Sequence, residues 1–256
     1  MKITAPTLPS RAIPYSFKEI EMDMFGVKQI MLLSKASALN SIKPAIDALN
    51  DVISVEANEL TDGDFFYLLT LQRLRYTRPL FTQWVCEVPL YYEKESVFHT
   101  SEGLRALVEA YEVAENKDEL QDPDKIQVVV GPCGTLNKHE LCEADLQIQY
   151  MDETKLPEGL DYPRIESFAD SIVEYNEPDM QYLSQAVRWL KTDSRSYLAK
   201  KNLFLKQDNL NLIEQAMFYK NTSVHGVRRT IVCRCTKCRT ASTHTLEIGP
   251  ESFFDV

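Results

Sequence analysis

The stretch that decides how this chain folds is a cysteine-rich segment, Val232-Cys233-Arg234-Cys235-Thr236-Lys237-Cys238-Arg239-Thr240. Three of the six cysteines of the chain fall within its six positions 233–238. Apolar residues precede the segment, and Leu246 and Ile248 alternate with polar residues after it. A Cys-x2-Cys spacing places two thiolates on one turn, as in metal-binding knuckles. The segment therefore predicts a short β-hairpin whose tip binds a metal ion.

The remaining cysteines lie far upstream, so the chain must fold back on itself if they bind the same ion. Structural zinc takes four thiolate or imidazole ligands in a tetrahedral arrangement, and two arrangements fit the residues present. In the first, a single site is formed by Cys133, Cys142, Cys235 and Cys238. In the second, there are two sites, formed by Cys86, Cys133, His139 and Cys142 and by Cys233, Cys235, Cys238 and His244. In both, protein ligands fill every position, which predicts structural zinc at one or two sites.

A different interpretation of the cysteines needs no metal. Cys86 and Cys233 would then be small buried apolar residues, and the others would be reduced thiols. The start of the chain lacks the apolar region of a secretory signal, and no run of about 18 apolar residues predicts a membrane helix. We therefore expect reduced cysteines, and clustered reduced cysteines favour metal binding over disulfides.

Charge is distributed unevenly along the 256 residues, whose formal net charge is −10. Residues 87–132 contain 11 acidic and 4 basic side chains, a net charge of −7, whereas residues 200–244 contain 9 basic and 2 acidic side chains, a net charge of +7. Such blocks are typical of solvated faces. They also suit surfaces of opposite charge that orient the docking of protein partners.

The periodicity of apolar residues predicts an α+β protein, with a mostly helical body and small antiparallel β-hairpins. An extended arm is expected over 4–17, followed by a half-buried strand around Ile20 and Met22. We expect strands over 81–92 and 126–130, and helices over 27–39, after Ser41, after Thr61, after Ser101, after Pro178, over 197–205 and over 209–219. The corresponding division of the chain is an N-terminal arm, strand and helical region (1–92), an acidic insertion (93–130), a ribbon-like hairpin with a helical region (131–222), and a zinc-ribbon-like hairpin with a tail (223–256).

Catalytic motifs are absent from the sequence. The 8 glycines form neither of the two glycine-rich motifs that bind nucleotide phosphates. His139-Glu140 near Cys133 has the wrong order for a zinc deaminase, and a zinc hydrolase would need an open coordination position with a nearby general base. Asp62-Gly63-Asp64 lacks the further ligands of a calcium loop and is better explained as the start of a helix. We therefore expect a protein that is not an enzyme.

Nucleic-acid binding is the main alternative function. Basic residues surround the predicted knuckle and could neutralise phosphates, namely Arg228, Arg229, Arg234, Lys237 and Arg239. The acidic net charge of the whole chain and the scarcity of aromatic residues among these cations argue against it. A zinc-ribbon nucleic-acid-binding regulator is therefore the second hypothesis.

Several motifs, taken in order, resemble the baseplate hub assembly proteins of T-even-like contractile-tailed bacteriophages. The similarity covers about two thirds of the chain and includes Leu8-Pro9-Ser10-Arg11 with Pro14-Tyr15, the segment 60–73 followed by Trp84-Val85-Cys86, the pair Cys133-Gly134, and the Cys-x2-Cys hairpin that runs into 246–254. The chain departs from the family in its acidic stretch 87–132 and in having Arg239 where the family usually has a glycine after the last cysteine.

The resemblance implies a non-enzymatic role in assembly of the tail baseplate hub, as a component or an assembly factor. Its partners would be other hub or tail proteins, and its location would be the host bacterial cytoplasm during assembly. A component that stays in the finished particle would be located in the tail baseplate, whereas an assembly factor would depart. No small-molecule substrate and no membrane contact are expected. The residues expected to contact partners are Leu8, Pro9, Ser10, Arg11, Arg228 and Arg229.

Overall fold

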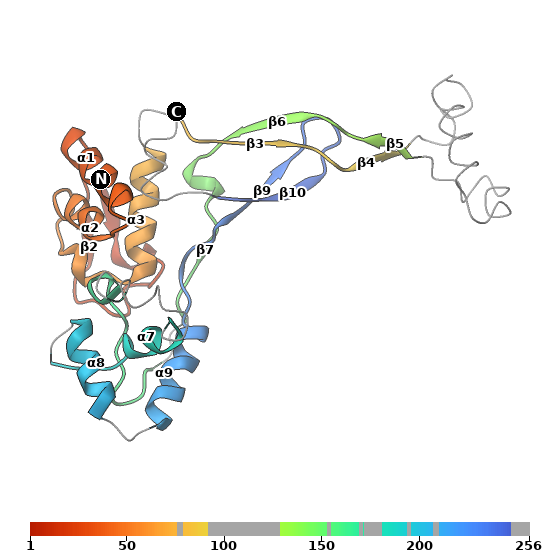
Figure 1. Cartoon of the computed structure of the whole chain (residues 1–256). Helices are drawn as coiled ribbons and strands as arrows, with labels where there is room; N and C mark the ends of the chain where they lie inside the picture. The colour runs from red at the N-terminus through yellow and green to blue at the C-terminus, as the bar shows by residue number, and fades with distance from the viewer. Residues whose placement is uncertain are drawn as a thin grey trace, which may run out of the picture. The chain divides into compact units, whose positions relative to one another are not determined.

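The computed structural model describes residues 1–75, 79–91, 129–152, 155–168, 171, 181–193, 196–206 and 210–246. Over these residues the chain is α+β, with helices and two-stranded antiparallel sheets, as predicted (Figure 1). Its contacts divide it into two units. Unit 1 comprises Met1–Pro79, Cys142–Ile231 and Thr245–Val256, and unit 2 comprises Leu80–Leu141 and Val232–His244. Each unit therefore joins segments that are distant in the sequence.

Unit 1 begins with a small sheet in which β1 (Lys2–Thr4) pairs antiparallel with β2 (Glu19–Glu21). Both strands alternate exposed and buried residues, and Ile3 and Ile20 enter the core. The connection between them is not the extended arm predicted from its prolines. It forms a 3-10 turn (Ala5–Thr7) and further turns, because burial of Leu8 holds it against the core.

Three helices form the larger core of unit 1, namely α1 (Val27–Ala38), α2 (Lys43–Asn50) and α3 (Asp62–Leu74). All three were predicted. Pro44 occupies the first turn of α2, where its missing N–H costs no hydrogen bond. On α1 the apolar residues divide between two faces, because Leu33 and Ala36 are buried whereas Val27 and Met31 are exposed.

The start of α3 is held by a buried polar cluster. The hydroxyl of Thr61 caps the helix and accepts from the N–H of Asp64 at 3.4 Å. The Asp64 carboxylate accepts hydrogen bonds from the backbone N–H of Ser10 at 2.9 Å and from the hydroxyl of Tyr15 at 2.5 Å. These bonds satisfy a fully buried carboxylate and tie the N-terminal turns to the helix.

A second apolar cluster in unit 1 surrounds α7 (Gln181–Val187), α8 (Tyr197–Lys206) and α9 (Leu210–Thr222). Ala186 of α7 and Ala216 of α9 are buried in it together with Met151 and Trp189. The 3.6-residue periodicity predicted these helices. Apolar residues of α7 and α9 enter the cluster, whereas Leu198 and Leu205 of α8 are exposed.

Close backbone contact joins α3 to β8 (Gly226–Val227), which pairs antiparallel with β7 (Ile148–Gln149). A Cβ atom on Gly63 would lie 2.5 Å from the backbone oxygen of His225, so no larger residue fits there without movement. Gly226 has a φ of +128°, which disfavours any side chain.

Unit 2 is built from two-stranded antiparallel ribbons. In the first, β3 (Phe81–Val85) pairs with β6 (Leu136–Glu140), and β4 (Pro89–Tyr91) pairs with β5 (Val129–Pro132). In the second, β9 (Thr230–Arg234) pairs with β10 (Ala241–Thr245), and residues 232–244 of this hairpin belong to unit 2. It is the hairpin predicted around the cysteine-rich segment.

Some predictions fall outside the described residues. They are the helix after Ser101, residues 93–128 of the predicted acidic insertion, the helix start at Pro178, and the tail after Leu246. Within the described residues, no helix has the length and apolar content needed to cross a lipid bilayer.

Removal of the Tyr15 hydroxyl should destabilise unit 1. This hydroxyl donates to Asp64 and accepts from the backbone N–H of Thr61 at 2.7 Å, so Tyr15→Phe leaves two groups short of a partner. We expect the free energy of unfolding to fall by about 1–3 kcal/mol in urea titrations. Tyr150→Phe is the matched control, because the Tyr150 ring is exposed and its contact with Arg11 needs no hydroxyl. Equal stability of the two variants would contradict the role given to Tyr15.

Tyr15→Phe should also change how the free energy of unfolding depends on pH. Burial, followed by the negative charge of Asp64, raises the pKa of Tyr15 above its ordinary value. Because an unfolded chain releases a tyrosine proton near pH 10, stability should fall as the pH rises above about 10, by at most about 1.4 kcal/mol per pH unit from this group. Tyr15→Phe should remove this contribution in urea titrations at pH 9, 10 and 11, and Tyr150→Phe should retain it.

Candidate metal centre

The ribbon of unit 2 holds two cysteines next to each other although they are 47 positions apart in the sequence. The backbone N–H of Cys86 donates to the carbonyl of Thr135 at 3.0 Å, and the backbone N–H of Cys133 donates to the carbonyl of Val88 at 2.8 Å. Gly134 lies between these bonds with a φ of +64°, a conformation that glycine adopts without strain. The antiparallel register therefore places Cys86 and Cys133 together.

The turn between β9 and β10 supplies the other two sulfurs. The backbone N–H of Cys235 donates to the carbonyl of Thr240 at 3.0 Å, and the N–H of Arg239 donates to the carbonyl of Cys235 at 3.1 Å. Arg239 has a φ of +62°, in the left-handed region where a glycine would be easiest to accommodate. The turn thus adopts the glycine-type conformation, although the sequence has arginine at this position.

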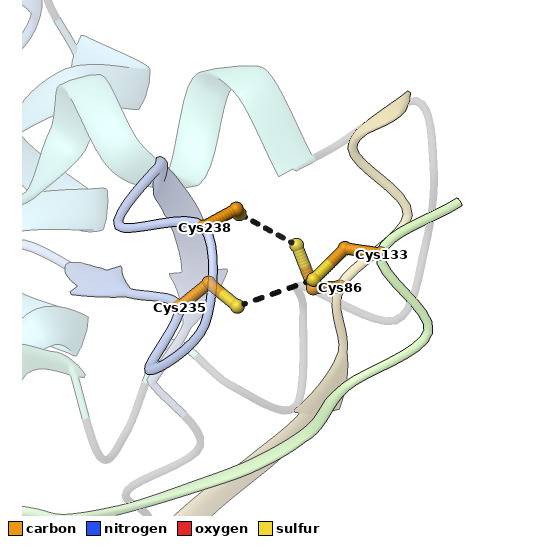
Figure 2. A group of neighbouring side chains, drawn as sticks. All are labelled: Cys86, Cys133, Cys235 and Cys238. Carbon is orange, nitrogen blue, oxygen red and sulfur yellow. Dashed lines mark hydrogen bonds between the residues drawn. The ribbon is translucent and has the colours of Figure 1, made fainter. Parts of the chain in front are cut away.

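Four sulfur atoms converge where the ribbon meets the turn (Figure 2). Sγ of Cys86 lies 3.6 Å from Sγ of Cys238, and Sγ of Cys133 lies 3.7 Å from Sγ of Cys235. All four sulfurs lie within 4.8 Å of one another. Tetrahedral coordination with metal–sulfur bonds of about 2.3 Å requires sulfurs about 3.8 Å apart. The four cysteines therefore have the chemistry and the spacing to hold one metal ion.

Hydrogen bonds make two of these sulfurs acidic. The backbone N–H of Cys238, helped by that of Lys237 and by the side-chain amide of Asn137, lowers the pKa of Cys235 to about 6, although burial acts in the opposite direction. The hydroxyl and the backbone N–H of Thr240 lower the pKa of Cys238. Both turn cysteines are thus prepared to be thiolates, which is the form that binds metal.

The ribbon contributes a sulfur of the opposite character. The backbone N–H of Val88 lowers the pKa of Cys86, but burial and the three neighbouring sulfurs outweigh it and raise this pKa to about 12. Several thiolates this close to one another repel unless a cation lies between them. A divalent cation bound by the four sulfurs would displace the Cys86 proton and offset half of the charge of four thiolates.

The observed set of four cysteines matches neither of the two ligand sets predicted from the sequence. It contains Cys86 in place of Cys142, and among the described residues it is a single group. Cys142 is exposed at the start of a 3-10 turn in unit 1, and its N–H donates to the Asp145 carboxylate at 2.8 Å. Cys233 is buried on β9, and its sulfur does not belong to the group. All six cysteines are described, and none forms a disulfide.

Neither histidine predicted as a ligand belongs to the group. His139 lies on β6 opposite Thr82. The ring of His244 packs against Trp84 with centroids 4.4 Å apart, and its Nε2 lies 2.6 Å from the hydroxyl of Ser242. Four sulfurs are already sufficient for tetrahedral coordination, so no imidazole is needed.

The residues expected to contact partners differ in their exposure. Leu8, Pro9 and Ser10 are buried in unit 1. Arg11, Arg228 and Arg229 are exposed. Leu8, Pro9 and Ser10 therefore pack inside the isolated chain. Only the three arginines of the expected partner-binding residues are accessible to a partner.

Asn137 is a site residue that the sequence did not reveal. It is buried on β6 and contacts both Cys235 and Thr236 in the turn. No spacing pattern marks an asparagine in a strand as a neighbour of a cysteine 98 positions later. Only the pairing of ribbon and turn brings them together.

Comparison with known proteins gives no relative: no family model, curated protein or solved structure matches this chain.

Substitution of a single turn cysteine should abolish tight metal binding. With Cys235→Ser one of the four sulfurs is lost, and we expect the metal content of the purified protein, measured by mass spectrometry, to fall from one ion per chain toward zero. The affinity should fall by more than the roughly 10- to 100-fold that outer-sphere changes cause. Cys142→Ser is the control, because the Cys142 sulfur lies outside the group, and it should retain one ion. Equal metal content in both variants, or none in the unmodified protein, would contradict this assignment.

Proposed function

We propose that the four sulfurs bind zinc and that the ion is structural. The observation that carries this proposal is the approach of Cys86, Cys133, Cys235 and Cys238 to within 4.8 Å of one another. A tetrahedral set of four thiolates suits zinc or iron, and zinc adds no redox chemistry. With four protein ligands no coordination position is left for a substrate, which is typical of structural sites.

The packing of unit 2 supports a structural role for the ion. Among its residues with described side chains, the buried ones are Cys86, Cys133, Asn137, Leu141, Cys233 and Cys235. Cysteines thus occupy the place that aliphatic side chains take in the clusters of unit 1. Two-stranded ribbons with so little apolar burial are marginal in water, and a bound metal is a usual way to stabilise them.

At the level of biology, we propose a non-enzymatic protein that acts through protein–protein contacts in assembly of a phage tail baseplate hub. The support for this proposal is the ordered resemblance of the motifs at Leu8–Arg11, 60–73 and the cysteine hairpin. A metal-clamped ribbon is compatible with it, because a clamped turn presents its side chains in one conformation to a partner.

The turn also supplies a charged surface for docking. Arg234, Lys237 and Arg239 are exposed around the two turn cysteines, and no ion pair between described residues includes them. Exposed cations on a rigid turn suit an acidic partner surface and speed its association. Arg228 and Arg229 extend the basic sequence on the N-terminal side of the same hairpin.

Phage production tests the proposed role. In the phage that encodes the chain, Cys235→Ser together with Cys238→Ser should leave heads and free tail parts without assembled baseplates, as seen by electron microscopy of lysates, and should reduce infectious titre by orders of magnitude. Cys142→Ser should assemble normally. Normal particles from the double variant would overturn the proposal.

The exposed cations also favour the second hypothesis, a regulator that binds nucleic acid. Neutralisation of phosphates by Arg234, Lys237 and Arg239 would make binding steeply salt-dependent, because each phosphate contact lowers log K by about 0.7–0.9 per unit of log salt concentration. We expect fluorescence anisotropy with duplex DNA and single-stranded RNA to show only weak binding at 150 mM salt. Submicromolar binding that weakens steeply with salt, and that is lost in Arg234→Glu with Lys237→Glu, would favour the regulator instead.

A further inference from the structure

Asn137 uses its whole side-chain amide to join the ribbon to the cysteine turn. Its Nδ2 donates to the carbonyl of Thr135 at 2.9 Å and to Sγ of Cys235 at 3.6 Å. Its Oδ1 accepts from the backbone N–H of Thr236 at 2.9 Å and from the hydroxyl of Thr236 at 3.0 Å. An asparagine amide has two donors and two acceptor positions, so every one is satisfied. The residue is 2% exposed, so the loss of any of these bonds would leave a buried polar group without a partner.

The surroundings also determine which way the amide points. The partner at one end is the carbonyl oxygen of Thr135, which can only accept, and the partner at the other end is the backbone N–H of Thr236, which can only donate. A flipped amide would place oxygen against oxygen and N–H against N–H. The N–H group must therefore face the Cys235 sulfur.

A hydrogen bond from this N–H group acts on the sulfur in two ways. It stabilises the negative charge of the thiolate, so that the sulfur can lose its proton and accept a metal. It also fixes the position of the sulfur, because the same side chain holds Thr236, the next residue in the turn. Neighbours that orient metal ligands in this way commonly change affinity by about 10- to 100-fold when they are removed.

We propose that Asn137 is a positioning residue of the metal centre: its amide donates to the Cys235 sulfur and holds the turn at Thr236, and so sets how tightly the four-cysteine site binds metal. This inference rests on the metal centre proposed above. In this inference Asn137, a residue of the ribbon, orients Cys235, a ligand that lies in the turn.

The first experiment detects the hydrogen bond directly in the unmodified chain. The protein is loaded with 113Cd, a spin-1/2 ion that replaces zinc in thiolate sites, and its NMR couplings to protons are recorded. We expect a coupling between the bound cadmium and a side-chain amide proton of Asn137, transmitted through the Cys235 sulfur. Cadmium coupled to the Cβ protons of all four cysteines, without any coupling to Asn137, would overturn the proposal.

The second experiment separates donation to sulfur from attachment of the turn. Asn137→Asp keeps an oxygen that accepts from Thr236 but removes the N–H that faces Cys235. We expect it to bind zinc about 10- to 100-fold more weakly in competition with a chromophoric chelator. With cobalt in place of zinc, the sulfur-to-cobalt charge-transfer band should move to longer wavelength, because a sulfur that has lost a hydrogen bond gives up electron density more easily.

Two control variants make the comparison specific. Asn50→Asp is the same substitution at a hydrogen-bonded asparagine in unit 1, whose Oδ1 accepts from the N–H of Ala57. Thr236→Val removes one donor to Asn137 and leaves the N–H that faces Cys235. Both should retain the position of the cobalt band, and Asn50→Asp should retain zinc affinity.

The outcomes distinguish this inference from the metal centre on which it rests. If the unmodified protein binds no metal, both are overturned. If it binds one ion and Asn137→Asp retains the same affinity and cobalt spectrum, the metal centre stands and the role of Asn137 is overturned. If Asn137→Asp fails to fold, the cadmium coupling in the unmodified chain decides the question alone.

Discussion

The convergence of four cysteine sulfurs is the interaction on which the architecture of unit 2 depends. Three separate parts of the sequence supply them, at Cys86, at Cys133 and in the turn that carries Cys235 and Cys238. Thiolates at these separations repel one another. A cation bound by the four sulfurs would offset this repulsion, and under the proposed function it would take the place of the apolar core that the ribbons lack.

The two units are stabilised by different physical means. Unit 1 has two apolar clusters built around helices, and its buried Asp64 carboxylate is paired with Ser10 and Tyr15. Unit 2 has short strands whose buried positions hold cysteines and Asn137. Burial of apolar area therefore stabilises the first unit, whereas the second has four cysteines that could hold a metal ion and a small number of directed hydrogen bonds.

The turn and the ribbon have complementary parts in the site. Amide and hydroxyl donors lower the pKa values of Cys235 and Cys238, so the turn supplies the two sulfurs that most readily become thiolates. The ribbon supplies Cys86, whose pKa is raised, and the Asn137 amide that reaches Cys235. Neither segment alone contains a complete ligand set, so a folded site needs both.

The sequence by itself determined the local structure. Apolar periodicity and capping residues such as Thr61 placed the helices, and the spacing of Cys235 and Cys238 predicted a hairpin with a metal-binding tip, because each of these signals acts over a few residues. Only the tertiary structure decided which distant cysteines join the tip. Strand register placed Cys86 beside Cys133 and left Cys142 exposed, and it brought Asn137 to the sulfur of Cys235. Register depends on pairing between segments many positions apart, so it cannot be predicted from the spacing of residues along one segment.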